Sequence, residues 1–273
     1  MNKSILKWAG NKSKIMPKIS RFFPNEYERY LEPFAGSLGS FLNSGVPFGF
    51  DIHLNDLNKE VINLFECVKA DPVKVASIAN SYGKEKDDYL KIRALDRASG
   101  FSNMCKWKRA ARVVYLNKTC FNGLWRENKK GHNNVPYGTP READVLPIAL
   151  ANTFSQSIQN VNFYSKDYSS FLKIAKAGDL IYFDPPYVDL KDPKKEFNGY
   201  VGGFGWKEQN ELVKKCKKLN LKGCFIIVSN SWCDATKELY KDFEMHKIQA
   251  PRTISRNKNG RKPVDELVAV LKV

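Results

Sequence analysis

The sequence predicts an α/β fold with a doubly wound, mostly parallel sheet, interrupted by an inserted, mainly helical region that includes a β-hairpin. Near the start of the chain, short apolar runs at residues 29–32 and 48–56 flank a glycine-bearing turn, the pattern of a strand–turn–helix–strand unit. Two later runs, residues 179–184 and 224–229, are almost continuously apolar, which is typical of parallel strands buried on both faces.

Helices are expected to connect these strands. Asn58 is a suitable N-cap for a helix over residues 59–69, because its side chain accepts backbone hydrogen bonds and the apolar residues that follow recur at helical spacing. Residues 206–219 have an amphipathic pattern whose inward side carries Leu212, Cys216 and Leu219. The remaining expected elements are helices at residues 40–43 and 234–241 and a closing strand at residues 267–273.

The inserted region is expected over residues 59–144, which leaves residues 1–58 and 145–273 as the core domain. Its first part is helical and polar, and residues 106–112 carry a basic helical face. Residues 128–134 form a polar turn that is able to join the two strands of a hairpin.

The chain is strongly basic. Its 273 residues include 45 Lys and Arg against 29 Asp and Glu, a formal net charge of +16. Such an excess favours nucleic acid or an anionic membrane surface as partner, although a solvated surface would explain it equally well. No apolar run is long enough to span a bilayer and residues 1–10 lack the pattern of a signal peptide, so we expect a cytoplasmic protein.

The cysteine and histidine content argues against a metal centre. The six cysteines form no Cys-x-x-Cys pair, and the chain has three histidines. We therefore expect no metal site, and we expect the cysteines to be reduced thiols.

The most specific motif is Asp184-Pro185-Pro186-Tyr187, directly after a predicted buried strand. Ligands of open α/β sheets bind at the carboxyl ends of strands, and two prolines make a stiff loop. A carboxylate, a free carbonyl and an aromatic ring then lie in one rigid loop, which suits an exocyclic amine on a flat ring. The alternative is a proline turn that ends a strand and exposes a tyrosine.

A second motif is the glycine-bearing loop Glu32-Pro33-Phe34-Ala35-Gly36-Ser37-Leu38-Gly39, between a strand and a helix. Such a loop lets the backbone approach a ligand closely. Asp56, at the end of the next strand, suits the two ribose hydroxyls of a nucleoside cofactor, and Asp51 is the rival for that role.

Several segments together resemble the Dam-like N6-adenine DNA methyltransferases of the alpha group, the D12 class. They are Leu6-Lys7-Trp8-Ala9-Gly10-Asn11-Lys12, the loop 32–39, Phe121-Asn122-Gly123-Leu124-Trp125-Arg126, Asn134-Val135-Pro136-Tyr137-Gly138, Asp184-Pro185-Pro186-Tyr187 and Val264-Asp265-Glu266-Leu267. The resemblance covers nearly the whole chain, and it departs from the family where Asn11 replaces a glycine. It implies the S-adenosylmethionine-dependent methyltransferase fold, with the insert as the DNA-recognition region.

The resemblance also implies roles for single residues. Asp184, Pro185 and Tyr187 would hold the target amine, and Asp184 would also touch the cofactor. The residues expected to line the S-adenosylmethionine site are Trp8, Lys12, Phe34, Gly36, Asp56, Asp167 and Asp184. The family's register favours Asp56 over Asp51, and Asp167 would bind the adenine amino group of the cofactor, unless it is a solvated turn residue.

Double-stranded DNA is the partner that the resemblance implies. The residues expected to contact it are Lys7, Phe121, Asn122, Leu124, Arg126 and Pro136. Arg126 would read a guanine, with a fork that matches O6 and N7. Phe121 would wedge into the base stack, although core packing is the alternative for Phe121 and Leu124. Phe197 and Tyr200 would help to hold the extruded base, and the basic residues 252–262 would bind phosphate or form a solvated turn.

The expected activity is methyl transfer from S-adenosylmethionine to adenine N6 at GATC, with the target base flipped out of the duplex by a monomeric enzyme. The alternatives are a different DNA site, an amine of RNA or of a protein glutamine, a small-molecule substrate, and a DNA-binding module without catalysis. Host regulation, mismatch repair and restriction–modification use the same chemistry, so the sequence leaves the biological role open.

Overall fold

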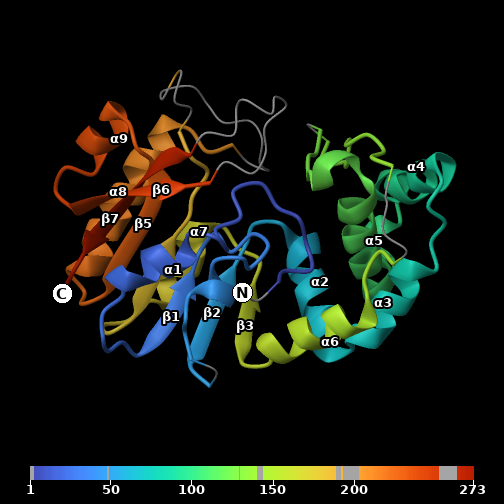
Figure 1. Ribbon diagram of the computed structural model, residues 1–273, viewed down its shortest axis with the longest axis horizontal. Coiled ribbons are helices and arrows are strands. Elements are labelled where there is room, and N and C mark those ends of the chain that lie inside the picture. Colours follow the sequence, from blue (N-terminus) through green and yellow to red (C-terminus); the bar gives the residue numbers. More distant parts are fainter. Residues whose placement is uncertain are drawn as a thin grey trace.

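The computed structural model describes residues 3–47, 49–128, 130–139, 144–188, 192, 203–251 and 263–273. Its centre is a seven-stranded sheet of order β3-β2-β1-β4-β5-β7-β6 (Figure 1). The strands are β1 (Arg29–Glu32), β2 (Asp51–Asn55), β3 (Val161–Tyr164), β4 (Leu180–Phe183), β5 (Phe225–Ser231), β6 (Glu244–Ala250) and β7 (Val264–Leu271). Strands β1 to β5 pair in parallel, and β7 runs antiparallel to both of its neighbours. The prediction of a mostly parallel α/β sheet is confirmed.

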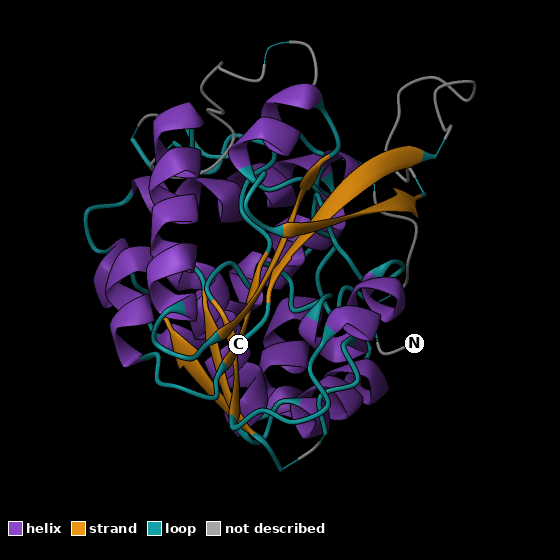
Figure 2. Ribbon diagram, turned by 90° about the vertical axis from the view of Figure 1, so that its left-hand side faces the viewer, coloured by secondary structure: helices purple, strands orange, loops and turns teal. Residues whose placement is uncertain are grey.

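Helices cover both faces of this sheet, and Figure 2 shows the twisted strands between them. Alternate side chains of β4 enter different hydrophobic clusters, Leu180 and Tyr182 on one face and Ile181 and Phe183 on the other. The helices are α1 (Met16–Ile19), α2 (Lys59–Ala70), α3 (Pro72–Asn80), α4 (Lys86–Ala94), α5 (Lys106–Thr119), α6 (Ile148–Ser157), α7 (Tyr168–Phe171), α8 (Trp206–Asn220) and α9 (Asp234–Leu239). The first cluster includes residues of α1 to α3, α5 and α6, and the second includes residues of α7 and α8.

Helices α2 to α6 form a group beside the sheet, at the opposite side of the molecule from β5 to β7 (Figure 1). Helix α5 packs against α2 and α3, and α6 packs against the same two helices. In the part of the chain that is described, no helix is both long and apolar enough to cross a membrane.

The prediction of a basic helical face over residues 106–112 is wrong in part. Arg112 is buried and pairs with Asp96 at 2.7 Å, while Arg109 makes two hydrogen bonds to the Glu60 carboxylate, at 2.7 and 3.0 Å. These two arginines hold helices and loops together, and only Lys106 and Lys108 of the segment are exposed basic side chains.

Other elements differ from the prediction in length. The helix expected at residues 40–43 is a single 3₁₀ turn, Phe41–Asn43. The described residues of the expected hairpin form two isolated antiparallel bridges, Cys120↔Tyr137 and Glu127↔Asn133, instead of two continuous strands. Two backbone hydrogen bonds join the arms here, from the Asn128 N–H to the His132 carbonyl and from the Asn134 N–H to the Arg126 carbonyl, and the Asn128 side chain closes the turn by accepting the N–H groups of Lys130 and His132.

The topology opens a crevice at the carboxyl ends of β1 and β4. These neighbours pair through Tyr30↔Leu180 and Leu31↔Ile181, but the chain leaves β1 toward β2 and leaves β4 toward β5. The loops that follow the two strands therefore diverge, and ligands of open α/β sheets bind at such a point.

Candidate active site

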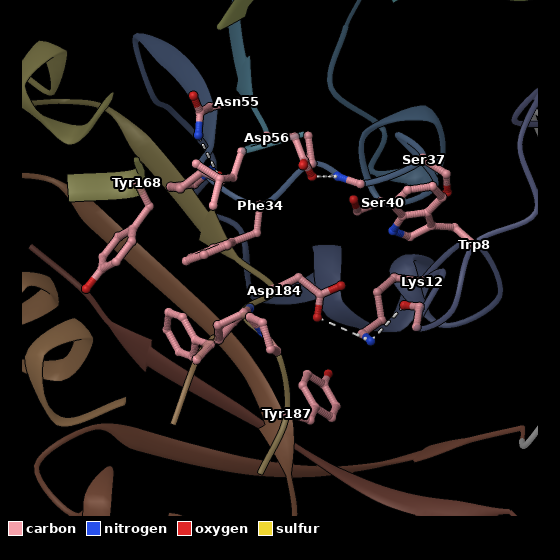
Figure 3. Close-up of a pocket in the computed structure, with 18 of the residues that line it drawn as sticks. Trp8, Lys12, Phe34, Ser37, Ser40, Asn55, Asp56, Tyr168, Asp184 and Tyr187 are labelled. Atoms are coloured by element: carbon pink, nitrogen blue, oxygen red, sulfur yellow. Dashed lines mark hydrogen bonds and ion pairs between the residues drawn. The ribbon is translucent and has the colours of Figure 1, made fainter. Parts of the chain in front are cut away.

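A pocket of about 500 Å³ lies at this crevice (Figure 3). The loops after β1, β2, β3 and β4 contribute to its lining, together with the N-terminal segment that carries Trp8 and Lys12. Every residue predicted at the cofactor site and in the Asp184-Pro185-Pro186-Tyr187 motif lines this one pocket. These residues come from five separate stretches of the chain, so the fold brings them together.

The glycine-bearing loop forms one wall of the pocket. Gly36 has φ +49°, and a Cβ atom there would lie 3.1 Å from the Trp8 ring. Its backbone N–H donates to Oδ2 of Asp56 at 2.9 Å, while Oδ1 of Asp56 accepts from the N–H of Asn58. Asp56 thus lines the pocket at the end of β2, whereas Asp51 is exposed at the other end of that strand and is not among the lining residues.

Aromatic rings form the adjoining wall. The Phe34 ring lies 5.2 Å from that of Tyr168 and 5.6 Å from that of Phe204, between centroids. Asp167 lines the pocket beside them and is exposed, and its Oδ1 accepts the backbone N–H of Ser169 at 2.9 Å as the N-cap of α7. The second carboxylate oxygen has no such role in the cap.

Asp184 lies at the centre of a charged cluster (Figure 3). The Nζ atom of Lys12 is 3.2 Å from Oδ1 of Asp184, 4.0 Å from Oε2 of Glu266 and 4.2 Å from the centre of the Tyr187 ring. The Tyr187 hydroxyl donates to Oε2 of Glu266 at 2.8 Å. Oδ1 of Asp184 is buried and faces the Lys12 ammonium, while the carboxylate as a whole stays 16% exposed, so its other oxygen remains open to a hydrogen bond from a ligand.

Burial raises the pKa of Asp184 to about 6, and the Glu266 charge adds to that rise, while the Lys12 ammonium lowers it. A pKa of about 6 lies close to neutral pH, so the charges of Lys12 and Glu266 affect which fraction of the Asp184 carboxylate is ionised there. The arrangement gives an ionised acceptor in a largely dry site.

The Asp184-Pro185-Pro186-Tyr187 loop is fixed by hydrogen bonds from the elements that pack against it. Gln209 of α8 is buried and donates to the Pro186 carbonyl at 2.7 Å, and its Oε1 accepts from Asn230 of β5 at 3.1 Å. The Pro186 carbonyl is thereby engaged, which leaves that of Pro185 as the neighbouring acceptor beside the carboxylate.

The pocket lining is acidic although the chain is basic. The lining carries five carboxylates among the described residues, Asp56, Asp167, Asp184, Glu208 and Glu266, against two lysines, Lys12 and Lys166. A negative cavity attracts cations, so this lining suits a positively charged ligand such as a sulfonium that also carries an ammonium group. The Gly36 wall, the open oxygen of Asp184 and this charge all fit S-adenosylmethionine.

Beneath the pocket, Glu32 is fully buried at the end of β1. Burial raises its pKa to about 8, although hydrogen bonds donated by Ser40 and Tyr30 favour the ionised form. Between about pH 4.5 and pH 8 the folded chain therefore keeps a proton on Glu32 that the unfolded chain has lost.

We expect the free energy of unfolding to fall with rising pH across that window, by about 1.4 kcal/mol per pH unit from this group. Glu32→Gln should remove this component, which urea unfolding followed by circular dichroism at pH 5, 6, 7 and 8 will measure. The exposed Glu26→Gln is the control and should keep the wild-type slope. Equal slopes in wild type and Glu32→Gln would contradict the assignment.

The predicted DNA-contacting residues also lie together. The side chain of Asn117, which is fully buried on α5, accepts the Lys7 N–H at 2.8 Å and donates to the carbonyls of Lys7 and Gly123, at 2.7 and 3.1 Å. The N–H of Phe121 donates to the Pro136 carbonyl at 2.9 Å. These bonds join the N-terminal segment, residues 121–126 and Pro136 into one surface.

Most of these side chains point outward. Phe121 is 45% exposed, so core packing does not explain it, whereas Leu124 is half-buried and packs against the core. Asn122, Arg126 and Pro136 are exposed, and Asn122 has φ +56°. The Arg126 guanidinium donates from Nε to Oδ1 of Asn134 at 2.7 Å and from Nη2 to the Asn134 carbonyl at 3.2 Å. Its outer Nη1–Nη2 edge stays available for two parallel hydrogen bonds.

Some predicted residues lie outside the part of the chain that the structure describes, and some residues at the site were not predicted. Phe197, Tyr200 and residues 252–262 lie outside the described residues. Within the described ranges, no group of three or more His, Cys, Asp or Glu is arranged to hold a metal ion. No role was expected for Glu266, Gln209 or Asn117. Glu266 could have been predicted, because its segment follows the family pattern. Gln209 and Asn117 could not, because nothing in the local sequence distinguishes these two amides from other polar residues of their helices.

Comparison with known proteins assigns this arrangement to a family. Residues 8–254 match the D12 class N6 adenine-specific DNA methyltransferase family. The chain is 34% identical over 267 residues to a type II methyltransferase, M1.LlaDCHI of Lactococcus lactis subsp. cremoris, covering 96% of this chain and 93% of that protein. It is 32% identical over 275 residues to a DNA adenine methylase of Vibrio cholerae serotype O1, covering 98% and 95%. It is 31% identical over 278 residues to a type II methyltransferase, M.MjaIII of Methanocaldococcus jannaschii, covering 95% of each.

These matches span nearly the whole chain, and the region that matches the family includes every pocket residue except Glu266, with the Asp184-Pro185-Pro186-Tyr187 loop and the surface around Arg126. The cofactor is accordingly S-adenosylmethionine, and the substrate is DNA. The chain belongs to the D12 class of N6 adenine-specific DNA methyltransferases.

Proposed function

We propose that this enzyme methylates adenine N6 within GATC sites of double-stranded DNA, and that it flips the target base into the pocket to do so. The observation that carries the proposal is the Asp184–Lys12 pair with its open carboxylate oxygen, in the pocket next to an exposed Arg126 surface. We further propose that residues 59–144 act as the recognition region and that residues 1–58 and 145–273 form the catalytic domain.

S-adenosylmethionine, when bound, supplies a methyl group that is electrophilic because it is attached to a sulfonium. In our proposal Trp8, Phe34, Gly36, Asp56 and Asp167 hold this cofactor. The Gly36 wall lets it approach the backbone, and the Asp56 carboxylate remains a hydrogen-bond acceptor at the wall of the pocket.

The amine that accepts the methyl group is a poor nucleophile, because its lone pair is delocalised into the purine. Asp184 and the Pro185 carbonyl accept hydrogen bonds from its two N–H groups, and these bonds strengthen as positive charge develops on the nitrogen. The nitrogen gains the methyl group as the bond from that group to sulfur breaks, and then loses one proton to Asp184 or to water. Lys12 keeps the carboxylate ionised, and Glu266 fixes the Tyr187 ring through its hydroxyl. One face of that ring is covered by Lys12, so the adenine would stack on the other.

The target base must leave the helix to reach a buried carboxylate, at a cost of a few kcal/mol. The exposure of Phe121 beside Lys7 and Pro136 supports its role as the side chain that enters the stack. Lys7, Asn122 and Leu124 complete the contact surface.

Site recognition rests on Arg126 in this proposal. Because Asn134 fixes one edge of the guanidinium, the other edge is oriented in advance for O6 and N7 of a guanine. The alternative is a different DNA site, which the neighbouring Trp125 and Glu127 favour if they alter the angle of Arg126. A binding module without catalysis is disfavoured by the complete Asp184 cluster.

The test is to incubate the protein with S-adenosylmethionine and unmethylated plasmid, and to map N6-methyladenine at every position. We expect methylation at GATC. Arg126→Ala should lower discrimination at the guanine by about 5- to 150-fold, which corresponds to the roughly 1–3 kcal/mol of a bidentate contact. Arg126→Lys should not restore it, since lysine lacks the fork.

The control is Lys130→Ala, an exposed charge on the same turn, which should leave the site preference unchanged. Methylation at another motif would reject GATC and keep the chemistry. A folded protein that binds the cofactor and transfers no methyl group to DNA would overturn the proposal.

A further inference from the structure

The cofactor pocket and the recognition surface meet at two tryptophans. Trp8 lines the pocket, while Trp125 belongs to the segment that carries Arg126. Their rings are stacked, with centroids 6.4 Å apart and an angle of 25° between the planes. Aromatic pairs in this range attract each other beyond the area they bury, so the position of one ring affects that of the other.

Trp8 is fixed from the side of the pocket. The place where a side chain of residue 36 would begin lies 3.1 Å from Cδ1 and Nε1 of the Trp8 ring, so the indole packs directly on the backbone of Gly36. A ligand that fills the pocket therefore contacts the Trp8 ring and limits its movement (Figure 3).

Trp125 is fixed from the side of the recognition surface. Its Nε1 donates to Oε1 of Glu127 at 2.9 Å, and Glu127 is bridged to Asn133 across the turn. Arg126 lies between Trp125 and Glu127 in the chain, and Asn134 fixes its guanidinium. A shift of the Trp125 ring would therefore change the turn that orients Arg126.

We propose that Trp125 is a positioning residue that couples the two sites, so that cofactor and specific DNA each tighten the binding of the other. This inference rests on the proposed function of the Arg126 surface. A cofactor in the pocket restricts the Trp8 ring, and this ring restricts the Trp125 ring that stacks on it. Trp125 and Glu127 together then orient the Arg126 guanidinium toward the guanine. The coupling is reciprocal by thermodynamic necessity, and coupling of this kind amounts to about 5- to 150-fold in affinity.

The experiment measures the dissociation constant of sinefungin, an unreactive analogue of the cofactor. It is measured with and without an unmethylated duplex that contains the site the enzyme methylates. In the wild type we expect the duplex to tighten sinefungin binding by more than about fivefold. Trp125→Phe retains a stacking ring and should keep most of that ratio. Trp125→Leu should bring the ratio close to one, while sinefungin affinity without DNA changes little.

A second pair of variants keeps the test valid if Trp125→Leu does not fold. Glu127→Gln retains an acceptor for the indole N–H and should keep the ratio, whereas Glu127→Ala should lower it. A purely structural role for Trp125 predicts a different result: both affinities weaken in Trp125→Leu and their ratio stays at the wild-type value, which would overturn the proposal.

The outcomes also separate this inference from the proposed function. A wild-type protein that methylates the duplex but shows a ratio of one contradicts the coupling and leaves the function intact. A wild-type protein that binds sinefungin and neither binds nor methylates any duplex contradicts both.

Discussion

Asp184→Ala is expected to lower kcat for methyl transfer to DNA on the order of 10²- to 10³-fold, the usual loss when one transition-state hydrogen-bonding group is removed. In the proposed reaction the carboxylate accepts a hydrogen bond from the target amine, and because this side chain is largely buried, water does not replace it well in the variant. The variant also leaves the Lys12 ammonium without its nearest carboxylate at 3.2 Å. Steady-state transfer of labelled methyl groups at saturating cofactor and DNA measures the loss.

Two further variants serve as controls for the loss of activity in Asp184→Ala. Asp184→Asn keeps the shape and one acceptor oxygen but loses the charge, so its activity should lie between those of wild type and Asp184→Ala. Asp51→Ala removes an exposed carboxylate at the far end of β2 and should retain wild-type kcat. Full activity in Asp184→Ala would show that the carboxylate is not the acceptor of the amine.

The fold could be predicted where single strands are strongly apolar. Strands β1, β4 and β5 are almost wholly buried, and their sequences show it. Strand β6 was missed because its residues, Glu244–Ala250, are mostly polar and only partly buried. Its extended structure comes from pairing with β7, which the local sequence does not encode.

The candidate site could be predicted as a set of motifs but not as a set of contacts. The residues expected at the cofactor site and in the Asp184-Pro185-Pro186-Tyr187 motif lie in one pocket, as the family pattern implied. The ion pair of Lys12 with Asp184, the bond of Tyr187 to Glu266 and the stacking of Trp8 on Trp125 each join distant parts of the chain. Such pairs depend on how the strands and loops are arranged, so no local pattern reveals them.

The same limit explains the basic segment of α5. Its charge pattern predicted a basic helical face, yet Arg109 and Arg112 are engaged by Glu60 and Asp96. A positive net charge counts these arginines although they are not available to DNA. The predicted contact surface is therefore smaller than the charge implies, and it centres on Lys7 and Arg126.

Lys12→Met is expected to move the acid limb of the kcat–pH profile to higher pH, and Glu266→Gln to move it to lower pH. In the proposed reaction, transfer requires the ionised form of Asp184, whose pKa burial raises to about 6, so we expect activity to fall as the pH drops through that value. The Lys12 charge lowers this pKa, and its removal raises it further. The Glu266 charge raises the pKa, and its removal lowers it.

Opposite shifts distinguish electrostatic control of Asp184 from general damage to the site, because damage lowers kcat in both variants without moving the limb in opposite directions. Lys12→Met should also lower the maximal kcat, since the carboxylate is no longer held in place by its ion-pair partner. Glu266→Gln keeps an oxygen for the Tyr187 hydroxyl, so its ring should stay in position while the charge is lost. Limbs that shift the same way, or remain at the wild-type pH, would mean that another group controls the acid side of the reaction.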